Sequence, residues 1–142
     1  MLKLLIYGLM LLVLFIIAIR DLKSREIDVR LTLLLLVGSV PAVALNRELS
    51  YVEAYSAGIL IFALLVMIYF LSKKNIGLGD VKLCACIAPY LGMEKSLTML
   101  LLAMVLCGAA AGLLLAFGKV KRNMELPFAP FAAVAVLMVL WI

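Results

Sequence analysis

The chain has 142 residues, of which 68% are hydrophobic, and a net charge of +5. Its mean hydropathy of +1.29 lies far above that of soluble domains and predicts a polytopic membrane protein. The longest polar stretch, residues 20–30, is too short to bury a core of its own. We therefore expect one membrane-embedded domain over residues 1–142. The basic residues cluster in short loops beside apolar runs, which indicates membrane topology rather than a nucleic-acid partner.

The sequence contains no histidine, which excludes Ser-His-Asp and Cys-His catalysis and the HExxH zinc site. The three cysteines, Cys84, Cys86 and Cys107, lie in apolar segments. A Cys-x-Cys pair without further ligands is a poor metal signal, so we interpret all three as small buried hydrophobic residues. We expect no metal and no organic cofactor.

The first apolar run covers residues 4–19 and follows Lys3, as the apolar region of a signal peptide would. No small-residue cleavage site follows, because the run ends at Arg20 and Asp21. We therefore predict a retained first helix. Residues 20–30 carry four basic and three acidic side chains and are predicted to form a loop.

Five more apolar runs predict an all-α fold with six transmembrane helices: residues 31–45, 54–71, 81–92, 97–117 and 127–142. The fourth would reach only roughly 18 Å, well short of a hydrocarbon core of about 30 Å. We expect this short helix to begin below the membrane surface, in a wet or thinned cavity. In the fifth run, the small residues 108–112 form a face that permits close contact with another helix, and Trp141 in the sixth is placed as an interfacial anchor.

Six spans place the first, third and fifth connections on one side of the membrane. These connections hold ten of the thirteen basic residues: Arg20, Lys23, Arg25, Arg30, Lys73, Lys74, Lys82, Lys119, Lys121 and Arg122. The other side has Lys3, Arg47 and Lys95. The positive-inside rule makes the basic side cytoplasmic and puts both termini outside. Asp21 and Asp80 then both face the cytoplasm.

An aspartate that opens a hydrophobic helix is costly, so Asp80 is a candidate functional residue. If Asp21 lies close enough to share a water with it, repulsion splits their titrations, and one carboxyl is protonated while the other is ionised. That is the aspartic-protease arrangement. We expect Asp80 to be the ionised member, because a helix N-terminus favours negative charge. Gly77 and Gly79 allow unusual backbone angles and, because they lack side chains, would let a substrate strand lie directly beside the aspartate.

Three segments carry a family resemblance, in the correct order. Residues 77–83, Gly-Leu-Gly-Asp-Val-Lys-Leu, resemble the GxGDxKL signature of type IV prepilin peptidases, which are bacterial membrane aspartyl proteases related to archaeal preflagellin peptidases. Residues 21–27, Asp-Leu-Lys-Ser-Arg-Glu-Ile, resemble the first aspartate box of that family. Residues 126–131, Leu-Pro-Phe-Ala-Pro-Phe, resemble its PFxPF box.

The resemblance implies that Asp21 and Asp80 are the catalytic pair, with Gly77, Gly79 and Lys82 in the active-site motif. It implies prepilin or pseudopilin substrates, cut on the cytoplasmic side after a glycine that ends a short basic leader. It also implies a multi-pass protein of the bacterial inner membrane, in contact with lipid. The oligomeric state stays open.

Several further residues are candidates for substrate binding. Glu26, Asp28 and Glu125 are acids on the cytoplasmic side that could meet a basic leader, although solvated loop charges are the alternative. Pro127 and Pro130 of the PFxPF box complete this group.

Two departures from the family pattern have consequences. Asp28 and the following valine stand where the family usually has Pro-Asn, which leaves the shape of the first loop open. The larger members carry a cytoplasmic insertion, often with paired CxxC motifs, that is associated with N-methylation of the mature pilin. This chain lacks both, so we predict protease activity without methyltransferase activity, as in the short members that serve Flp or tight-adherence pili.

Other classes of protein also hold aspartates in a membrane. Presenilin-type and signal-peptide-peptidase proteases share a GxGD motif, but they are much larger and have a PAL motif that is absent here. Lipoprotein signal peptidase uses two aspartates near the outer face. A non-catalytic assembly subunit or an ion-coupled transporter could use intramembrane aspartates for pairing or proton relay.

Overall fold

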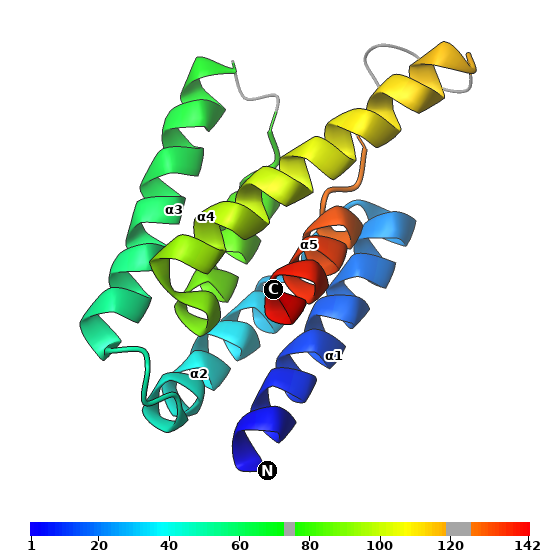
Figure 1. The fold of residues 1–142 in the computed structure, drawn as a ribbon. Coiled ribbons are helices and arrows are strands. Elements are labelled where there is room, and N and C mark those ends of the chain that lie inside the picture. Colours follow the sequence, from blue (N-terminus) through cyan, green and yellow to red (C-terminus); the bar gives the residue numbers. More distant parts are fainter. Residues whose placement is uncertain (73–75, 119–125) are drawn as a thin grey trace.

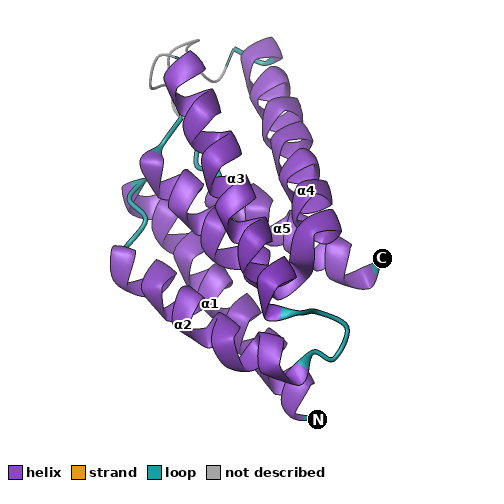
Figure 2. Ribbon diagram, turned by 90° about the vertical axis from the view of Figure 1, so that its left-hand side faces the viewer, coloured by secondary structure: helices purple, strands orange, loops and turns teal. Residues whose placement is uncertain are grey.

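The computed structural model describes residues 1–72, 76–118 and 126–142, and every regular element in these ranges is a helix (Figure 2). The elements in chain order are α1 (Leu2–Ser24), α2 (Val29–Leu45), α3 (Tyr51–Leu71), α4 (Leu78–Ala116) and α5 (Ala129–Trp141). The all-α prediction is confirmed for the described residues.

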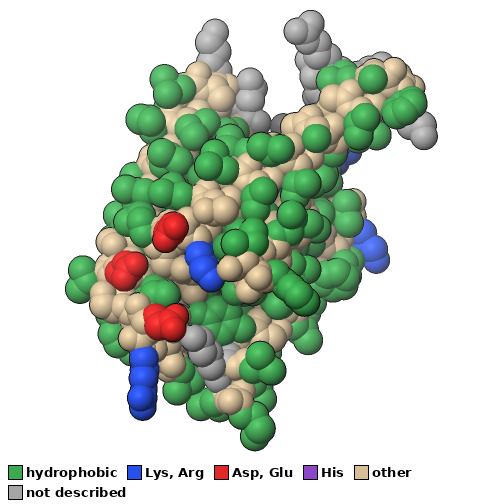
Figure 3. Space-filling model, in the orientation of Figure 1, with side chains coloured by type: hydrophobic (Ala, Val, Ile, Leu, Met, Phe, Trp, Pro, Cys, Tyr) green, Lys and Arg blue, Asp and Glu red, His purple; other side chains and the backbone are tan. Residues whose placement is uncertain are grey.

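Three helices are long and apolar enough to cross a membrane: Leu4–Ser24, Tyr51–Leu71 and Leu78–Ala116. Val29–Leu45 and Ala129–Trp141 are shorter apolar helices. Large hydrophobic side chains cover most of the face in Figure 3. The acidic side chains visible on that face lie toward the end where α2 and α3 meet, whereas basic side chains lie both there and at the opposite edge. Because a lipid bilayer solvates apolar side chains, this surface is that of a membrane protein.

The predicted fourth and fifth helices are one element, α4, broken at Gly92. This glycine has φ 78° and ψ 179°, which are not helical angles, and the two halves run in opposite directions (Figure 1). The buried Ser96 hydroxyl lies 3.0 Å from the Ala88 carbonyl and also contacts the Gly92 carbonyl, so it connects the two halves. If the halves are counted separately, the described chain has six helical segments in the predicted order.

The predicted loop over residues 20–30 is wrong at both ends. α1 continues to Ser24 and is closed by Arg25 in the left-handed conformation, with φ 55°. α2 begins directly after Asp28, whose side chain accepts a hydrogen bond from the Arg30 N–H at 2.9 Å. Residues 20–24 contain no helix breaker, and Lys23 complements the negative end of the helix dipole. Asp21 therefore lies in the last turn of a helix rather than in a loop.

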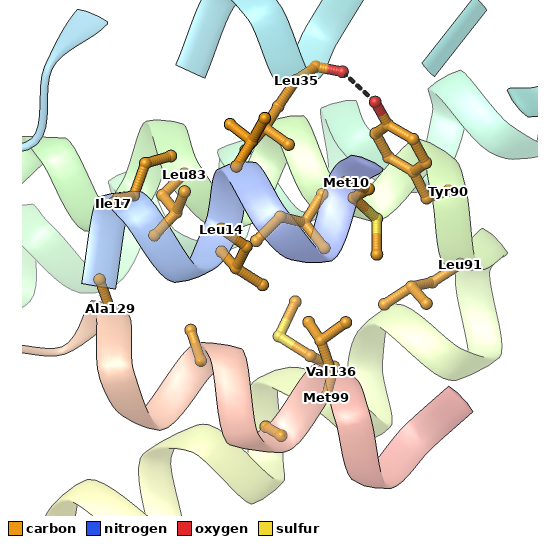
Figure 4. Packing of buried hydrophobic residues seen from close by; sticks show 14 of the residues in the cluster. Met10, Leu14, Ile17, Leu35, Leu83, Tyr90, Leu91, Met99, Ala129 and Val136 are labelled. Carbon is orange, nitrogen blue, oxygen red and sulfur yellow. Dashed lines mark hydrogen bonds between the residues drawn. The ribbon is translucent and has the colours of Figure 1, made fainter. Parts of the chain in front are cut away.

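One hydrophobic core joins α1 and α5 to α2 and both halves of α4 (Figure 4). Met10, Leu14 and Ile17 of α1 are almost completely buried in it. The Tyr90 hydroxyl donates to the Leu35 carbonyl at 2.6 Å, so the apolar core also holds a satisfied polar group. A second cluster joins α3 to α4 through buried residues that include Ile61.

Within the described residues, the close helix contact that the small residues 108–112 would permit is not made at Gly108 or Gly112. A Cβ atom added at Gly108 or at Gly112 would meet nothing within 4 Å. Both glycines are exposed in this chain. The small-residue face is therefore an uncovered surface of the second half of α4.

Replacing Gly92 should destabilise the fold. In Gly92→Ala, the positive φ costs about 1–2 kcal/mol for an L-residue, and the new Cβ would lie 3.1 Å from a Leu49 methyl carbon. We expect a lower thermal unfolding temperature for the purified protein in detergent, measured by circular dichroism. Gly112→Ala is the matched control, because it adds the same methyl group in open space and should leave the unfolding temperature unchanged or higher. Equal stability of Gly92→Ala and wild type would contradict this role of the kink.

Candidate active site

A cavity of about 530 Å³ opens where α1 ends and where α2, α4 and α5 begin. It is lined by residues of α1, α2 and α4 and of the connections, including the segment that precedes α5: Asp21, Arg25, Glu26, Ile27, Val29, Thr32, Ile76, Gly77, Gly79, Asp80, Lys82, Cys107, Leu126, Pro127 and Phe128. Asp21 and Asp80, 59 positions apart in the sequence, thus face the same space. The start of α4 lines this cavity, which agrees with the prediction that the short fourth helix begins in a cavity.

Asp21 is held in place by the first turn of α5. Its side chain is 4% exposed, and Oδ2 accepts a hydrogen bond from the Ala129 backbone N–H at 3.0 Å. Ala129 is the first residue of α5, so the positive end of that helix dipole also lies against the carboxylate. The contact joins the first and last helices and fixes the direction of the Asp21 side chain.

The sequence around Pro130 explains why a single amide of α5 is directed at Asp21. Pro130 has no N–H, and the Phe131 N–H donates to the Phe128 carbonyl at 3.0 Å. Proline is also well tolerated in the first turn of a helix, where an N–H would have no partner in the helix. The Ala129 N–H is then the donor of this turn that reaches Asp21. Pro130 does not line the cavity, but it shapes the helix start that positions the carboxylate.

Asp80 lies in the first turn of α4 and is half-buried. Its backbone N–H donates to the Gly77 carbonyl at 3.1 Å, which closes the first turn. Negative charge is favourable at this end of the helix. Each aspartate therefore lies against a helix N-terminus. Asp80 is in the first turn of α4, whereas Asp21, in the last turn of α1, faces the N-terminus of α5.

The two glycines of the motif serve close packing rather than unusual backbone angles. Gly77 has φ −69° and ψ 130°, which any residue can adopt, and Gly79 is helical, so neither glycine uses the unusual backbone angles that it would allow. A Cβ on Gly77 would lie 3.1 Å from Oδ2 of Asp80. A Cβ on Gly79 would lie 3.1 Å from Cβ of Ile27. The glycines make room for the carboxylate and for the connection between α1 and α2.

The remaining sequence candidates fall into two groups. Lys82, Glu26 and Pro127 line the cavity with the aspartates. Asp28 does not: the Arg20 guanidinium contacts its carboxylate at 2.8 Å, and its side chain caps α2. The hydrogen bond from the backbone N–H at position 30, followed by the contact with Arg20, lowers the pKa of Asp28. Glu125 lies outside the described residues.

Sequence reasoning missed several lining residues. Arg25 and the buried Thr32 both face the cavity, and the Thr32 hydroxyl donates to the Val29 carbonyl at 2.9 Å. Their place depends on where α1 ends and α2 begins, which the predicted loop obscured. The first aspartate box, residues 21–27, could have indicated both residues, because Arg25 lies inside it and Thr32 lies shortly after it.

The cysteines differ from one another. Cys84 is fully buried, as predicted, whereas Cys86 and Cys107 are partly exposed. Cys107 lines the cavity although it is far from either aspartate box, because the kink at Gly92 returns the second half of α4 to this end of the bundle. Within the described residues, no group of three or more His, Cys, Asp or Glu side chains could hold a metal ion.

The fold and the site define a helical membrane protein with two aspartates in one cavity at the ends of its helices. The model of the type IV leader peptidase family matches residues 8–113, and the chain belongs to that family. Membership of a peptidase family indicates that the protein is a peptidase. No curated protein and no solved structure gives a significant match.

The contact with α5 predicts different stabilities for two Asp21 variants. Asp21→Ala leaves the buried Ala129 N–H without its acceptor, so we expect the free energy of unfolding to fall by about 1–3 kcal/mol. Asp21→Asn keeps an oxygen acceptor and should stay closer to wild type. Chemical unfolding of the detergent-solubilised proteins would measure both. If the alanine variant is as stable as the asparagine variant, the hydrogen bond does not support the fold.

Proposed function

We propose that this protein is a membrane aspartyl endopeptidase that removes the short basic leader of prepilins or pseudopilins. It cuts after a glycine, on the cytoplasmic side of the membrane. The observation that carries the proposal is the shared cavity of Asp21 and Asp80 in a chain of the type IV leader peptidase family. Two carboxylates of this kind can activate water and protonate a leaving group without a histidine.

The proposed reaction uses the aspartates as a coupled pair. The ionised member takes a proton from a water molecule as that water attacks the scissile carbonyl. The protonated member stabilises the developing oxyanion and then donates its proton to the leaving nitrogen. Because strongly interacting carboxyls titrate as a pair, the two roles belong to the pair rather than to fixed residues. The sequence-based assignment of the negative charge to Asp80 stays a prediction.

Other cavity residues have proposed roles in binding. Glu26 is exposed at the cavity and can meet a basic leader, and Pro127 lines the same cavity. Lys82 and Gly79 complete the proposed active-site motif beside Asp80. Asp28, Glu125 and Pro130 remain proposed substrate contacts, although the ion pair of Asp28 and the place of Pro130 in α5 favour indirect roles.

The proposal includes the topology expected from the charge distribution. The chain would form one domain with six spans, both termini outside and the catalytic cavity at the cytoplasmic face of a bacterial inner membrane. The proposed chemistry needs no cofactor beyond the carboxyls and water. The absence of a CxxC-bearing insertion supports peptidase activity without methyl transfer.

The direct test is co-expression with a candidate prepilin, followed by mass spectrometry of the pilin. We expect Asp21→Asn and Asp80→Asn each to reduce leader removal by roughly 10²- to 10⁴-fold, the usual contribution of a general acid or base. Glu94→Gln is the matched control, since it makes the same change at an exposed carboxylate that does not line the cavity. It should cleave at the wild-type rate.

Two outcomes would contradict the proposal. Cleavage that survives either aspartate substitution at the wild-type rate would remove the two-carboxyl mechanism. A wild-type protein that cuts none of several prepilins would instead favour the non-catalytic assembly subunit or the ion-coupled transporter. A transporter would depend on Asp80 for ion flux.

A further inference from the structure

Arg25 is the one non-glycine residue of the described chain with a positive φ. Its φ of 55° and ψ of 24° are left-handed, a region in which the Cβ atom of an L-residue is crowded. Helices commonly end in this conformation, but glycine, or sometimes asparagine, usually occupies the position. The bond that closes α1, from the Arg25 backbone N–H to the Asp21 carbonyl at 2.9 Å, needs no side chain. The end of α1 therefore does not explain why an arginine stands here.

The Arg25 side chain is exposed and lines the cavity of the two aspartates. Within the described chain its guanidinium makes no ion pair, since the ion pair there joins Arg20 to Asp28. Lys23 already supplies a basic side chain to the last turn of α1. Residues with strained backbone angles persist where the surrounding structure holds them, and they cluster at functional sites. The strain and the place of the side chain together indicate a role inside the cavity.

The cavity is rich in hydrogen-bond acceptors and poor in donors. Its described lining includes three carboxylates, which only accept hydrogen bonds when ionised: Asp21, Glu26 and Asp80. The strong donors among the described lining side chains are Arg25 and Lys82, because the Thr32 hydroxyl already donates to a backbone carbonyl at 2.9 Å. A peptide that enters the cavity brings carbonyl groups, which need donors once water is displaced. The guanidinium has five N–H donors in a planar fork, so it can bind two acceptors at once.

We propose that Arg25 is a substrate-binding residue whose guanidinium donates to main-chain carbonyl oxygens of the peptide beside the scissile bond. This inference rests on the proposed function. A basic leader offers the guanidinium no anionic side chain, so the carbonyls are the acceptors that every substrate of this class carries. Arg25 lies one helical turn from Asp21 and is bonded to its carbonyl, so a strand held by the guanidinium can pass beside the Asp21 carboxylate.

The test separates the strain at Arg25 from its function. Arg25→Gly relieves the positive φ and keeps the backbone bond to Asp21, so we expect a thermal unfolding temperature equal to or above that of wild type. Loss of the charged donors should nevertheless raise KM for prepilin cleavage about tenfold or more, with kcat nearly unchanged. Arg25→Lys keeps the charge but loses the planar fork, and it should give an intermediate KM.

A matched pair of variants controls for charge. Arg25→Gln and Lys23→Gln each remove one positive charge from the end of α1, but Lys23 does not line the cavity. We expect Arg25→Gln to raise KM as Arg25→Gly does, and Lys23→Gln to match wild type in KM and kcat.

Three outcomes overturn this inference while the peptidase activity stands. A wild-type KM in Arg25→Gly and Arg25→Gln would mean that the substrate does not bind the guanidinium. A shifted pH profile at unchanged KM would mean that Arg25 acts on the aspartates rather than on the substrate. A loss of kcat that accompanies a lower unfolding temperature would mean that the side chain supports only the fold.

If the wild type cuts no prepilin, the proposed function fails, and binding then tests the inference separately. A labelled prepilin is titrated into Asp80→Asn with and without Arg25→Gly. Binding that is about tenfold weaker with Arg25→Gly supports the inference. Equal binding, or no binding to either protein, overturns it.

Discussion

The hydrogen bond from the Ala129 N–H to the Asp21 carboxylate is the contact on which the site depends. Its two residues are 108 positions apart in the sequence, the largest separation among the side-chain hydrogen bonds of the described residues. The bond joins the end of α1 to the start of α5. The core below it continues the same pairing, because Leu14 and Ile17 of α1 lie with Val136 of α5 in one cluster (Figure 4). A buried carboxylate needs such a partner, since an isolated buried charge is very costly. The Asp21 carboxylate, which we propose to be catalytic, is thus also a structural link between the two ends of the chain.

The break at Gly92 is the second constraint, and it acts on the other aspartate. Because α4 reverses there, its second half runs back past the start of its first half, and Cys107 lines the cavity together with Asp80. A straight helix of 39 residues could not bring these positions together. The kink also leaves the face that contains Gly108 open, so one glycine with a positive φ determines both the packing of α4 and the open surface of its second half.

The sequence was sufficient for the fold class, for the position of Asp80 in the first turn of a helix, and for a cavity around that turn. It put Asp21 at the end of the first helix but counted it in the loop, because a dense group of charges resembles a loop. In the structure α1 continues past Arg20 to Ser24, and the Arg20 and Asp28 side chains pair across the short connection to α2. The packing roles of Gly77 and Gly79 could not be predicted, since they depend on how closely Ile27 and the Asp80 carboxylate approach. The small residues at 108–112 permit a close helix contact, but the spacing of small residues cannot say whether the partner helix belongs to the same chain.

The central claim is that Asp21 and Asp80 act as one acid–base pair, and the pH dependence of cleavage tests it most directly. The measurement is kcat/KM for leader removal by the purified enzyme across the pH range in which it remains folded. We expect a bell-shaped profile, because the proposed reaction requires one carboxyl ionised and its partner protonated. The two apparent pKa values then belong to the pair. A rate that rises with pH and then stays at its maximum into alkaline solution would contradict the account, since no protonated carboxyl would then be needed.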